Sequence, residues 1–381
     1  EIKWIMICTV IQFVITFLFN TTAMTIQAYE RFVFIRLCLI IACVLQPCIN
    51  LLLLYHGGNV VTISVATLVI SFLTYVVYYC YAKKVLDLKY KFDNFDKNLF
   101  KNIFVFSAFL FLNTITDQLT FSTDNIILGI FSGSIMVAIY SVGSNFKNYF
   151  MAFSTSASSV FAPKINKIIA ESGSDDETNE IFIRIGRIQF YIVTLILLGY
   201  IFWGRQFVYL WVGNEYSDAY WIGLLLMISV YVPCFQNIGL EIQKAKNMHK
   251  ARSVVYFLIA IVNIIITIPL SLLYGGIGAS FATCLCMFIG TVIFMNIYNY
   301  KKVGIDIPAF WKSIFRILPG MIIPIVYGVF INCFININSY WNLLFVILGF
   351  VLLYFMSCWF FSMNHYEKDI FSKPLKRFLK K

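Results

Sequence analysis

Long apolar runs, separated by short polar gaps, cover most of the chain. Eleven runs come close to the 20 or so residues with which a helix crosses a bilayer, where the backbone has no other hydrogen-bond partner. We therefore predict eleven membrane-spanning helices, at residues 4–22, 32–54, 58–81, 102–131, 134–161, 188–204, 219–240, 253–273, 277–298, 318–337 and 341–362. Very short gaps at 56–58, 132–134 and 275–276, each containing glycine, predict antiparallel helix hairpins.

The basic residues lie almost entirely in every second gap. All Lys and Arg residues except Lys3, Lys147 and Arg205 fall in six segments, at 30–36, 83–101, 164–187, 244–252, 301–316 and 366–381. Cytoplasmic loops of multi-pass membrane proteins are enriched in these residues, so we expect the six segments, including the C-terminus, to be cytoplasmic. Eleven spans then place the N-terminus of this chain outside, and we expect an N-terminal piece with an odd number of spans to precede it.

Composition agrees with this interpretation and narrows the function classes. Hydrophobic residues make up 60% of the chain and charged residues 12%, which is too apolar for a soluble domain. The net charge of +11 is spread over six short segments without a nucleic-acid-binding motif, so we expect anionic membrane lipids as partners and no nucleic acid. The ten cysteines all lie in apolar runs, and we find no phosphate-binding glycine loop, nucleophile elbow or metal-ligand spacing. We therefore expect no catalytic residue, metal or cofactor.

Similar segments recur along the chain at an offset of about 217 residues. Residues 20–36 resemble 237–252, and the stretch from 55 to 84 resembles the stretch from 274 to 302. We interpret this as a duplication in which the second copy is a complete six-helix lobe and the first copy keeps only its last three helices. Three further spans, in about 115 residues, are expected upstream. An even number of helices per copy gives both lobes one orientation, related by a pseudo-two-fold axis along the membrane normal.

The predicted fold is thus an all-α polytopic membrane protein with two six-helix bundles, the first incomplete, and two extra C-terminal helices. Its segments are the last three helices of the first lobe (1–84), an amphipathic linker (85–101), the second lobe (102–302), a second amphipathic linker (303–317), two additional transmembrane helices (318–363) and a basic cytoplasmic tail (364–381). Within the linkers, 87–101 and 306–317 are expected to form interfacial helices.

Polar residues inside two adjacent spans are the main candidates for function. A charge near the bilayer centre costs at least about 2.5–3.5 kcal/mol, so it must face a cavity or a partner. In the first of these spans, the spacings of 4, 3 and 4 residues place four polar side chains on one helical face. We predict that the two helices line one water-filled cavity through Asn113, Asp117, Thr120, Asp124, Ser141, Asn145, Lys147 and Asn148.

Two interpretations stay open for the charged members of this set. Lys147 either attracts an anionic substrate or forms a structural ion pair with Asp117 or Asp124. The two aspartates either carry a coupling proton or sodium ion or serve as structural partners and cavity lining. Near the expected cytoplasmic end of a later span, Gln236, Asn237 and Glu241 fit both a cytoplasmic gate and an interfacial position.

Several motifs resemble the polysaccharide branch of the multidrug/oligosaccharidyl-lipid/polysaccharide exporter superfamily, and specifically Wzx-type flippases. They are Thr123-Asp124-Asn125-Ile126-Ile127-Leu128-Gly129, Val137-Ala138-Ile139-Tyr140-Ser141-Val142-Gly143, Phe161-Ala162-Pro163-Lys164-Ile165, Leu210-Trp211-Val212-Gly213-Asn214-Glu215-Tyr216 and Tyr274-Gly275-Gly276-Ile277-Gly278-Ala279. The resemblance implies two bundles that open alternately to either side of the bacterial cytoplasmic (inner) membrane. It implies transport of undecaprenyl-pyrophosphate-linked oligosaccharides for O-antigen, lipopolysaccharide or capsule assembly, alongside polysaccharide-assembly partners. A cationic cavity around Lys147 suits the pyrophosphate.

Two other functions compete with this transporter. A cation-coupled multidrug exporter of the same superfamily binds cations, and it should therefore lack a net positive cavity. A membrane polysaccharide polymerase, an enzyme, usually needs a large external loop, whereas the longest external loop expected here is about 205–218. We therefore favour a transporter over an enzyme.

Overall fold

The computed structural model describes residues 2–29, 31–86, 97–101, 122–159, 175–246, 248–335 and 339–369, with isolated positions between 103 and 119. Every regular element in these residues is a helix, and eight helical stretches are long and apolar enough to cross a membrane. The chain is therefore an all-α multi-pass membrane protein, as predicted. It divides into two compact units, Glu1–Lys101 and Asn102–Lys381.

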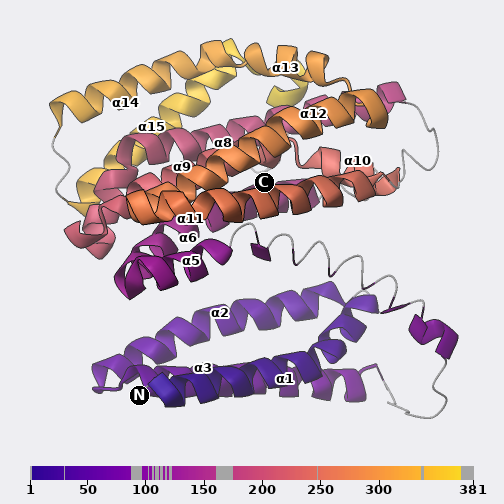
Figure 1. The fold of residues 1–381 in the computed structure, drawn as a ribbon, viewed down its shortest axis with the longest axis vertical. Helices are drawn as coiled ribbons and strands as arrows, with labels where there is room; N and C mark the ends of the chain where they lie inside the picture. Colours follow the sequence, from indigo (N-terminus) through magenta and orange to yellow (C-terminus); the bar gives the residue numbers. More distant parts are fainter. Residues whose placement is uncertain are drawn as a thin grey trace, which may run out of the picture. The chain divides into compact units, whose positions relative to one another are not determined.

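Three long helices form the first unit: α1 (Ile2–Ala28), α2 (Phe32–Tyr55) and α3 (Val60–Lys84) (Figure 1). α3 packs against both of the others. Amide side chains link them, because Gln12 donates to Ser71 at 3.1 Å and Gln46 donates to Thr67 at 2.5 Å. Such interhelical hydrogen bonds satisfy polar groups that lipid cannot. Most of the remaining surface of these helices is apolar, as expected of helices with lipid as their solvent.

The second unit contains the longer part of the chain (Figure 1). Its elements are α5 (Thr123–Phe131), α6 (Gly133–Ser159), α8 (Asp175–Val212), η1 (Asn214–Tyr216), α9 (Asp218–Phe235), α10 (Ile238–Ala245), α11 (His249–Met287), η2 (Phe288–Phe294), α12 (Met295–Tyr298), η3 (Asn299–Val303), α13 (Ile307–Phe315), η4 (Leu318–Met321), α14 (Ile322–Phe334) and α15 (Tyr340–Phe361). One large aromatic and aliphatic core, which includes Trp203, Phe310 and Phe350, holds α6, α8, α9, α13 and α15 together.

Nine of the predicted spans overlap the eight membrane-length stretches, because the stretch Arg252–Val303 contains both 253–273 and 277–298. The predicted span 219–240 is interrupted, since α9 ends at Phe235 and α10 begins at Ile238. The predicted span 134–161 corresponds to α6, whose many polar residues keep it out of that set. Of the predicted span 102–131, the structure describes α5 and isolated residues before it. The total of eleven spans therefore stays a prediction.

All three predicted hairpin turns contain a glycine with positive φ. Gly57, between α2 and α3, has φ +79°, Gly133, the first residue of α6, has φ +83°, and Gly275, inside α11, has φ +54°. Side chains disfavour this left-handed region, which glycine adopts freely. At Gly275 the turn separates α11 into two halves, and Asn263 in the first half donates a 3.2 Å hydrogen bond to Thr283 in the second. The two halves thus face each other, as the predicted hairpin requires.

The predicted interfacial segment 306–317 contains α13 (Ile307–Phe315), and the apolar residues of this helix pack into the protein core. Phe310 is fully buried against Phe182 and Phe235, with ring centroids 4.7 and 6.0 Å away. A Cβ at Gly186 of α8 would lie only 2.4 Å from the Phe310 ring, so glycine permits this close approach. The second linker is therefore part of the core of its unit.

An ion pair joins α8 to the end of the C-terminal helices. The Arg187 guanidinium donates to both carboxylate oxygens of Glu367, at 2.5 and 3.1 Å, and to the Ser313 and Ser362 carbonyls. Arg187 and Glu367 are both almost completely buried. A two-pronged arginine–carboxylate contact is geometrically specific, so it fixes this part of α8 against the chain around Glu367. Glu367 belongs to the predicted basic tail, 364–381, and the structure shows that its side chain is buried.

The start of α8 also differs from the sequence expectation. The helix α8 begins 13 residues before the predicted span 188–204, and Asp175, Asp176 and Glu177 form its first turn. Their exposed carboxylates lie where the partial positive charge of the helix N-terminus stabilises them. The predicted span 188–204 is thus the central part of a longer helix.

Candidate functional site

A buried carboxylate surrounded by hydroxyl and amide groups lies between α5, α6 and α11. Asp124, in the first turn of α5, is 1% exposed. Its Oδ2 accepts hydrogen bonds from the Tyr140 hydroxyl at 2.5 Å and the Thr283 hydroxyl at 2.9 Å. Asn263 and Thr267 continue the network, since Thr267 donates to Asn263 at 3.3 Å and Asn263 donates to Thr283 at 3.2 Å. The network therefore draws on both halves of the α11 hairpin.

This cluster has the chemistry of a proton or small-cation site. A carboxylate inside a membrane protein is costly unless it is paired or protonated, and such residues are characteristic of ion and proton pathways. The oxygens of Asp124, Asn263, Thr267 and Thr283 are hard ligands of the type that small cations prefer. Among the described residues, no group of three or more His, Cys, Asp and Glu side chains is suited to hold a metal ion.

Lys147 lies near the middle of α6 and is 4% exposed. Its positive charge acts on the Asp124 carboxylate of the neighbouring helix. Lys147 and Asp124, two of the three charged residues that the sequence singled out, are thus close enough to interact electrostatically. This arrangement is compatible with both interpretations of Lys147, because a charge near a buried carboxylate can be a structural feature or part of a transport site.

The other predicted residues of α6 occupy a different face. Asn145 and Asn148 are exposed and Ser141 is half-buried, whereas Lys147 points into the unit. Thr155 and Ser156 extend the exposed polar stripe toward the end of α6. A polar stripe of this kind is unsuited to lipid, so it fits the predicted cavity lining.

Three of the predicted site residues cannot be placed in this arrangement. Asn113, Asp117 and Thr120 lie outside the residues that the structure describes. Their alignment with Asp124 on one helical face therefore stays a prediction.

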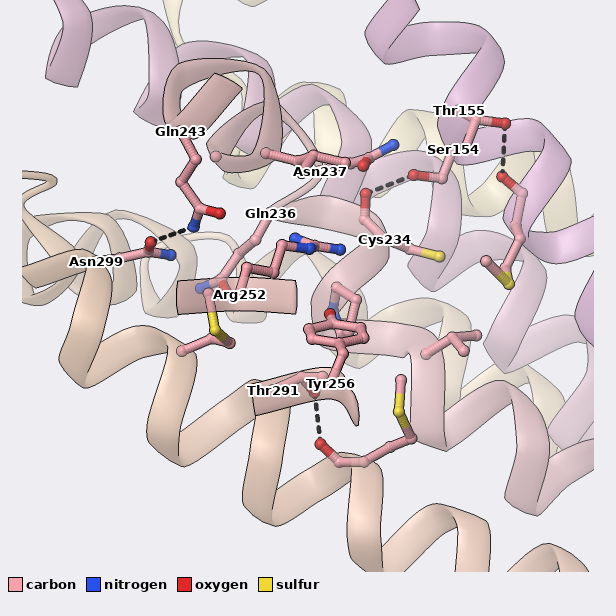
Figure 2. Close-up of a pocket in the computed structure, with 17 residues that line it drawn as sticks. Ser154, Thr155, Cys234, Gln236, Asn237, Gln243, Arg252, Tyr256, Thr291 and Asn299 are labelled. Carbon is pink, nitrogen blue, oxygen red and sulfur yellow. Dashed lines mark hydrogen bonds between the residues drawn. The ribbon is translucent and has the colours of Figure 1, made fainter. Parts of the chain in front are cut away.

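The second unit also contains a cavity of about 300 Å³, lined by α6, α9, α10, α11, η2, α12 and η3 (Figure 2). It lies beside the segment 244–252, which the distribution of Lys and Arg predicts to be cytoplasmic. The break between α9 and α10 contributes Gln236 and Asn237 to its wall, and Pro233 lies just before this break. The cavity has polar and apolar sides, because methionines line it together with amides and hydroxyls.

Sequence reasoning found this cavity only in part. Gln236 and Asn237 line it. Glu241 is not among the lining residues, and its carboxylate accepts a 2.9 Å hydrogen bond from Lys244. Arg252 and Gln243 also line the cavity. The sequence placed Arg252 in a basic loop. Its position directly before an apolar run is the sequence feature that could have indicated its place in the cavity wall.

Comparison with known proteins agrees with the all-helical membrane fold. A family model described as "Polysaccharide biosynthesis protein" matches residues 2–220, more than half of the chain. Among solved structures, the chain is similar to "Lipid II flippase MurJ, inward closed conformation", with a TM-score of 0.70 and 17% sequence identity. The match covers 97% of this chain and 74% of that one, and at this identity it shows a shared fold. The comparison with curated proteins finds no match.

Proposed function

This chain belongs to the polysaccharide biosynthesis protein family, and from this premise we propose that it is a flippase for lipid-linked oligosaccharides. Its substrate would be an undecaprenyl-pyrophosphate-linked repeat unit, moved from the cytoplasmic to the outer leaflet of the bacterial cytoplasmic membrane. The product serves O-antigen or capsule assembly. The shared fold supports the class of transport, since the protein in the similar solved structure is named as a flippase of lipid II.

The observation that carries the proposal is the buried lysine in the middle of α6. Lys147 places a positive charge inside a helix bundle, where an anionic substrate is attracted more strongly than in water. The polar stripe with Asn145 and Asn148 offers hydrogen-bond partners for sugar hydroxyls on the adjacent face of the same helix. Transport proceeds by alternating access, in which the two lobes expose one cavity to each side of the membrane in turn.

The Asp124 network supplies the coupling element of this proposal. A proton or sodium ion that binds Asp124 would lessen its attraction for Lys147 and leave the lysine charge available to the pyrophosphate. Because the two charges act on each other, binding of a cation and of an anionic substrate would be mutually favourable. The same carboxylate would also suit the alternative, a cation-coupled multidrug exporter, but a buried lysine disfavours cationic substrates.

The decisive experiment is the substitution Lys147→Ala in the complete gene, in a strain in which that gene is otherwise deleted. We expect the deletion to abolish surface polysaccharide and the variant to restore less than about a tenth of it, because each 1.4 kcal/mol of lost binding is tenfold. Lys244→Ala is the matched control, since the Lys244 side chain is 54% exposed and outside the site.

Three readouts separate the candidate functions. Surface polysaccharide is measured by immunoblotting, lipid-linked intermediates by extraction, and protein level in the membrane by a C-terminal tag. Undiminished polysaccharide in the Lys147→Ala strain would contradict the role of this lysine. Unchanged polysaccharide in the deletion strain, together with increased sensitivity to cationic drugs, would favour the multidrug exporter.

A further inference from the structure

The cavity beside α10 contains one charged side chain among the described residues that line it, that of Arg252. The Arg252 guanidinium lies over the Tyr256 ring, 4.5 Å from its centroid. No carboxylate among the described residues lies within salt-bridge distance of it. An aromatic face offsets part of the cost of a desolvated cation, but it does not neutralise the charge. The cavity is therefore electrostatically complementary to an anion.

The guanidinium group narrows the kind of anion. Its planar set of N–H donors matches the oxygens of a phosphate or carboxylate, to which it can donate two parallel hydrogen bonds. Figure 2 shows the Arg252 side chain near the centre of the lining residues, with Gln236 and Tyr256 beside it. An oxyanion in the cavity could therefore meet the guanidinium and neutral polar groups together.

Two amide side chains that line the same cavity carry buried polar atoms without a hydrogen-bond partner. Gln243 is 1% exposed and donates to Asn299 at 2.5 Å, but its Oε1 has no hydrogen-bond partner. The Nε2 group of Gln236 is also buried without a partner. Buried polar atoms are normally paired, so one free acceptor and one free donor indicate a ligand with both kinds of group. Sugar hydroxyls donate and accept hydrogen bonds in this way.

Part of the cavity wall is formed by π-helical turns instead of α-helix. Phe288–Phe294 (η2) and Asn299–Val303 (η3) are π-helical, and Thr291 and Asn299 from these turns line the cavity. Short π-helical segments occur frequently at functional sites, because the wider turn repositions side chains. The volume of about 300 Å³ is at the lower end of the range for small-molecule sites, so it suits a head group and not a complete lipid.

We propose that this cavity binds the phosphate–sugar junction of a lipid-linked saccharide, with Arg252 on the phosphate and Gln236 and Gln243 on the adjoining sugar. The site rests on the proposed flippase function and adds to it a head-group position within the second unit, separate from Lys147. Because the cavity adjoins the segment predicted to be cytoplasmic, it would receive the head group on the side where transport begins.

The test measures binding to the complete protein in nanodiscs of neutral phosphatidylcholine. Farnesyl diphosphate is the probe, and farnesol is its uncharged counterpart. We expect Arg252→Ala to weaken farnesyl diphosphate binding at least about tenfold, as loss of a charge-assisted contact implies, and to leave farnesol binding unchanged. Arg252→Lys, which keeps the charge without the planar donor set, should retain part of the affinity.

The chain offers a closely matched control. Arg184 also lies over a tyrosine ring, 4.7 Å from the centroid of Tyr366, but it is outside the cavity and its side chain is 46% exposed. Arg184→Ala should bind farnesyl diphosphate like the unaltered protein. Normal binding by Arg252→Ala, or equal weakening in Arg184→Ala, would overturn the site.

Two further measurements test the sugar contact and the source of the phosphate. Gln236→Leu should weaken binding of farnesyl-diphospho-N-acetylglucosamine more than binding of farnesyl diphosphate, and equal effects would contradict the sugar contact. Soluble UDP-N-acetylglucosamine should compete poorly, whereas competition as strong as that of the lipid-linked probe would assign the site to a soluble phosphorylated ligand instead.

Failure of this site and failure of the proposed function give different results. If the deletion strain keeps its surface polysaccharide, the flippase function fails whatever Arg252 binds. If Lys147→Ala abolishes surface polysaccharide while Arg252→Ala binds farnesyl diphosphate normally and supports polysaccharide, the head-group site alone is wrong.

Discussion

At the scale of single residues, the most informative side chain is Asp124. It is buried between three helices, accepts hydrogen bonds from Tyr140 and Thr283, and lies within electrostatic reach of Lys147. Its position in a polar span was predictable from the sequence. Its partners were not, because Tyr140 and Thr283 resemble ordinary interior residues until the α11 hairpin brings Thr283 beside α5.

Asp124→Asn should separate the charge of this residue from its packing. Asparagine has nearly the same volume and keeps one carbonyl oxygen as an acceptor, so we expect normal amounts of folded protein. Transport should nevertheless fall about tenfold or more, because the amide cannot bind a proton and binds a cation poorly. Surface polysaccharide relative to protein level measures this effect. The exposed residue Asp176 gives the control Asp176→Asn, and full transport by Asp124→Asn would exclude a coupling role.

At the scale of elements, close packing of α6 on α9 holds the second unit together. A Cβ at Gly143 of α6 would lie 2.8 Å from the Ile222 side chain and 2.9 Å from the Ala219 carbonyl oxygen. Small residues allow such approach between membrane helices, where van der Waals packing is a main source of association. Because a backbone oxygen is one of the neighbours, the contact cannot relax by a side-chain rotation alone.

Gly143→Ala should therefore push α6 away from α9 and lower the stability of the protein by about 1–3 kcal/mol. Gly129→Ala is the matched control, since a Cβ there would meet only Val137, at an ordinary 3.6 Å. Alanine is preferred to glycine inside helices by roughly 0.5–1 kcal/mol, so the control should be neutral or slightly stabilising. Thermal unfolding of the detergent-solubilised protein, followed by size-exclusion chromatography, compares the two. Equal thermal stability of the two variants would refute this account of the α6–α9 contact.

At the scale of the whole molecule, the alternation of basic gaps predicts which ends of the helices face the cytoplasm. The segments around residues 84 and 246 carry Lys clusters, whereas those around 57 and 214 carry none. The structure shows the helices that connect these segments, and the distribution of Lys residues predicts which ends of those helices are cytoplasmic. The proposed function depends on this orientation, because a flippase must accept its substrate on the side where that substrate is made.

Fusions of alkaline phosphatase, which is active only outside the cytoplasm, test this orientation in the complete gene. Fusions after residues 57 and 214 should be active, and fusions after residues 84 and 246 should be inactive. Fusions of a cytoplasmic reporter at the same four points should give the opposite pattern. Phosphatase activity after residue 84 or 246 would reverse the assignment and place the Arg252 cavity on the outer side.

The sequence by itself determined the membrane class and nearly all of the described spans, and it singled out Asp124 and Lys147, which the structure shows to be buried. Lipid requires long apolar helices and tolerates few buried charges, and both requirements are local and readable along the chain. Only the tertiary structure decided that Asp124 meets Thr283, that Phe310 of the second linker is core, and that Arg252 and Gln243 share a cavity. These contacts join residues from distant helices. Their formation depends on how helix faces pack, which no local pattern specifies.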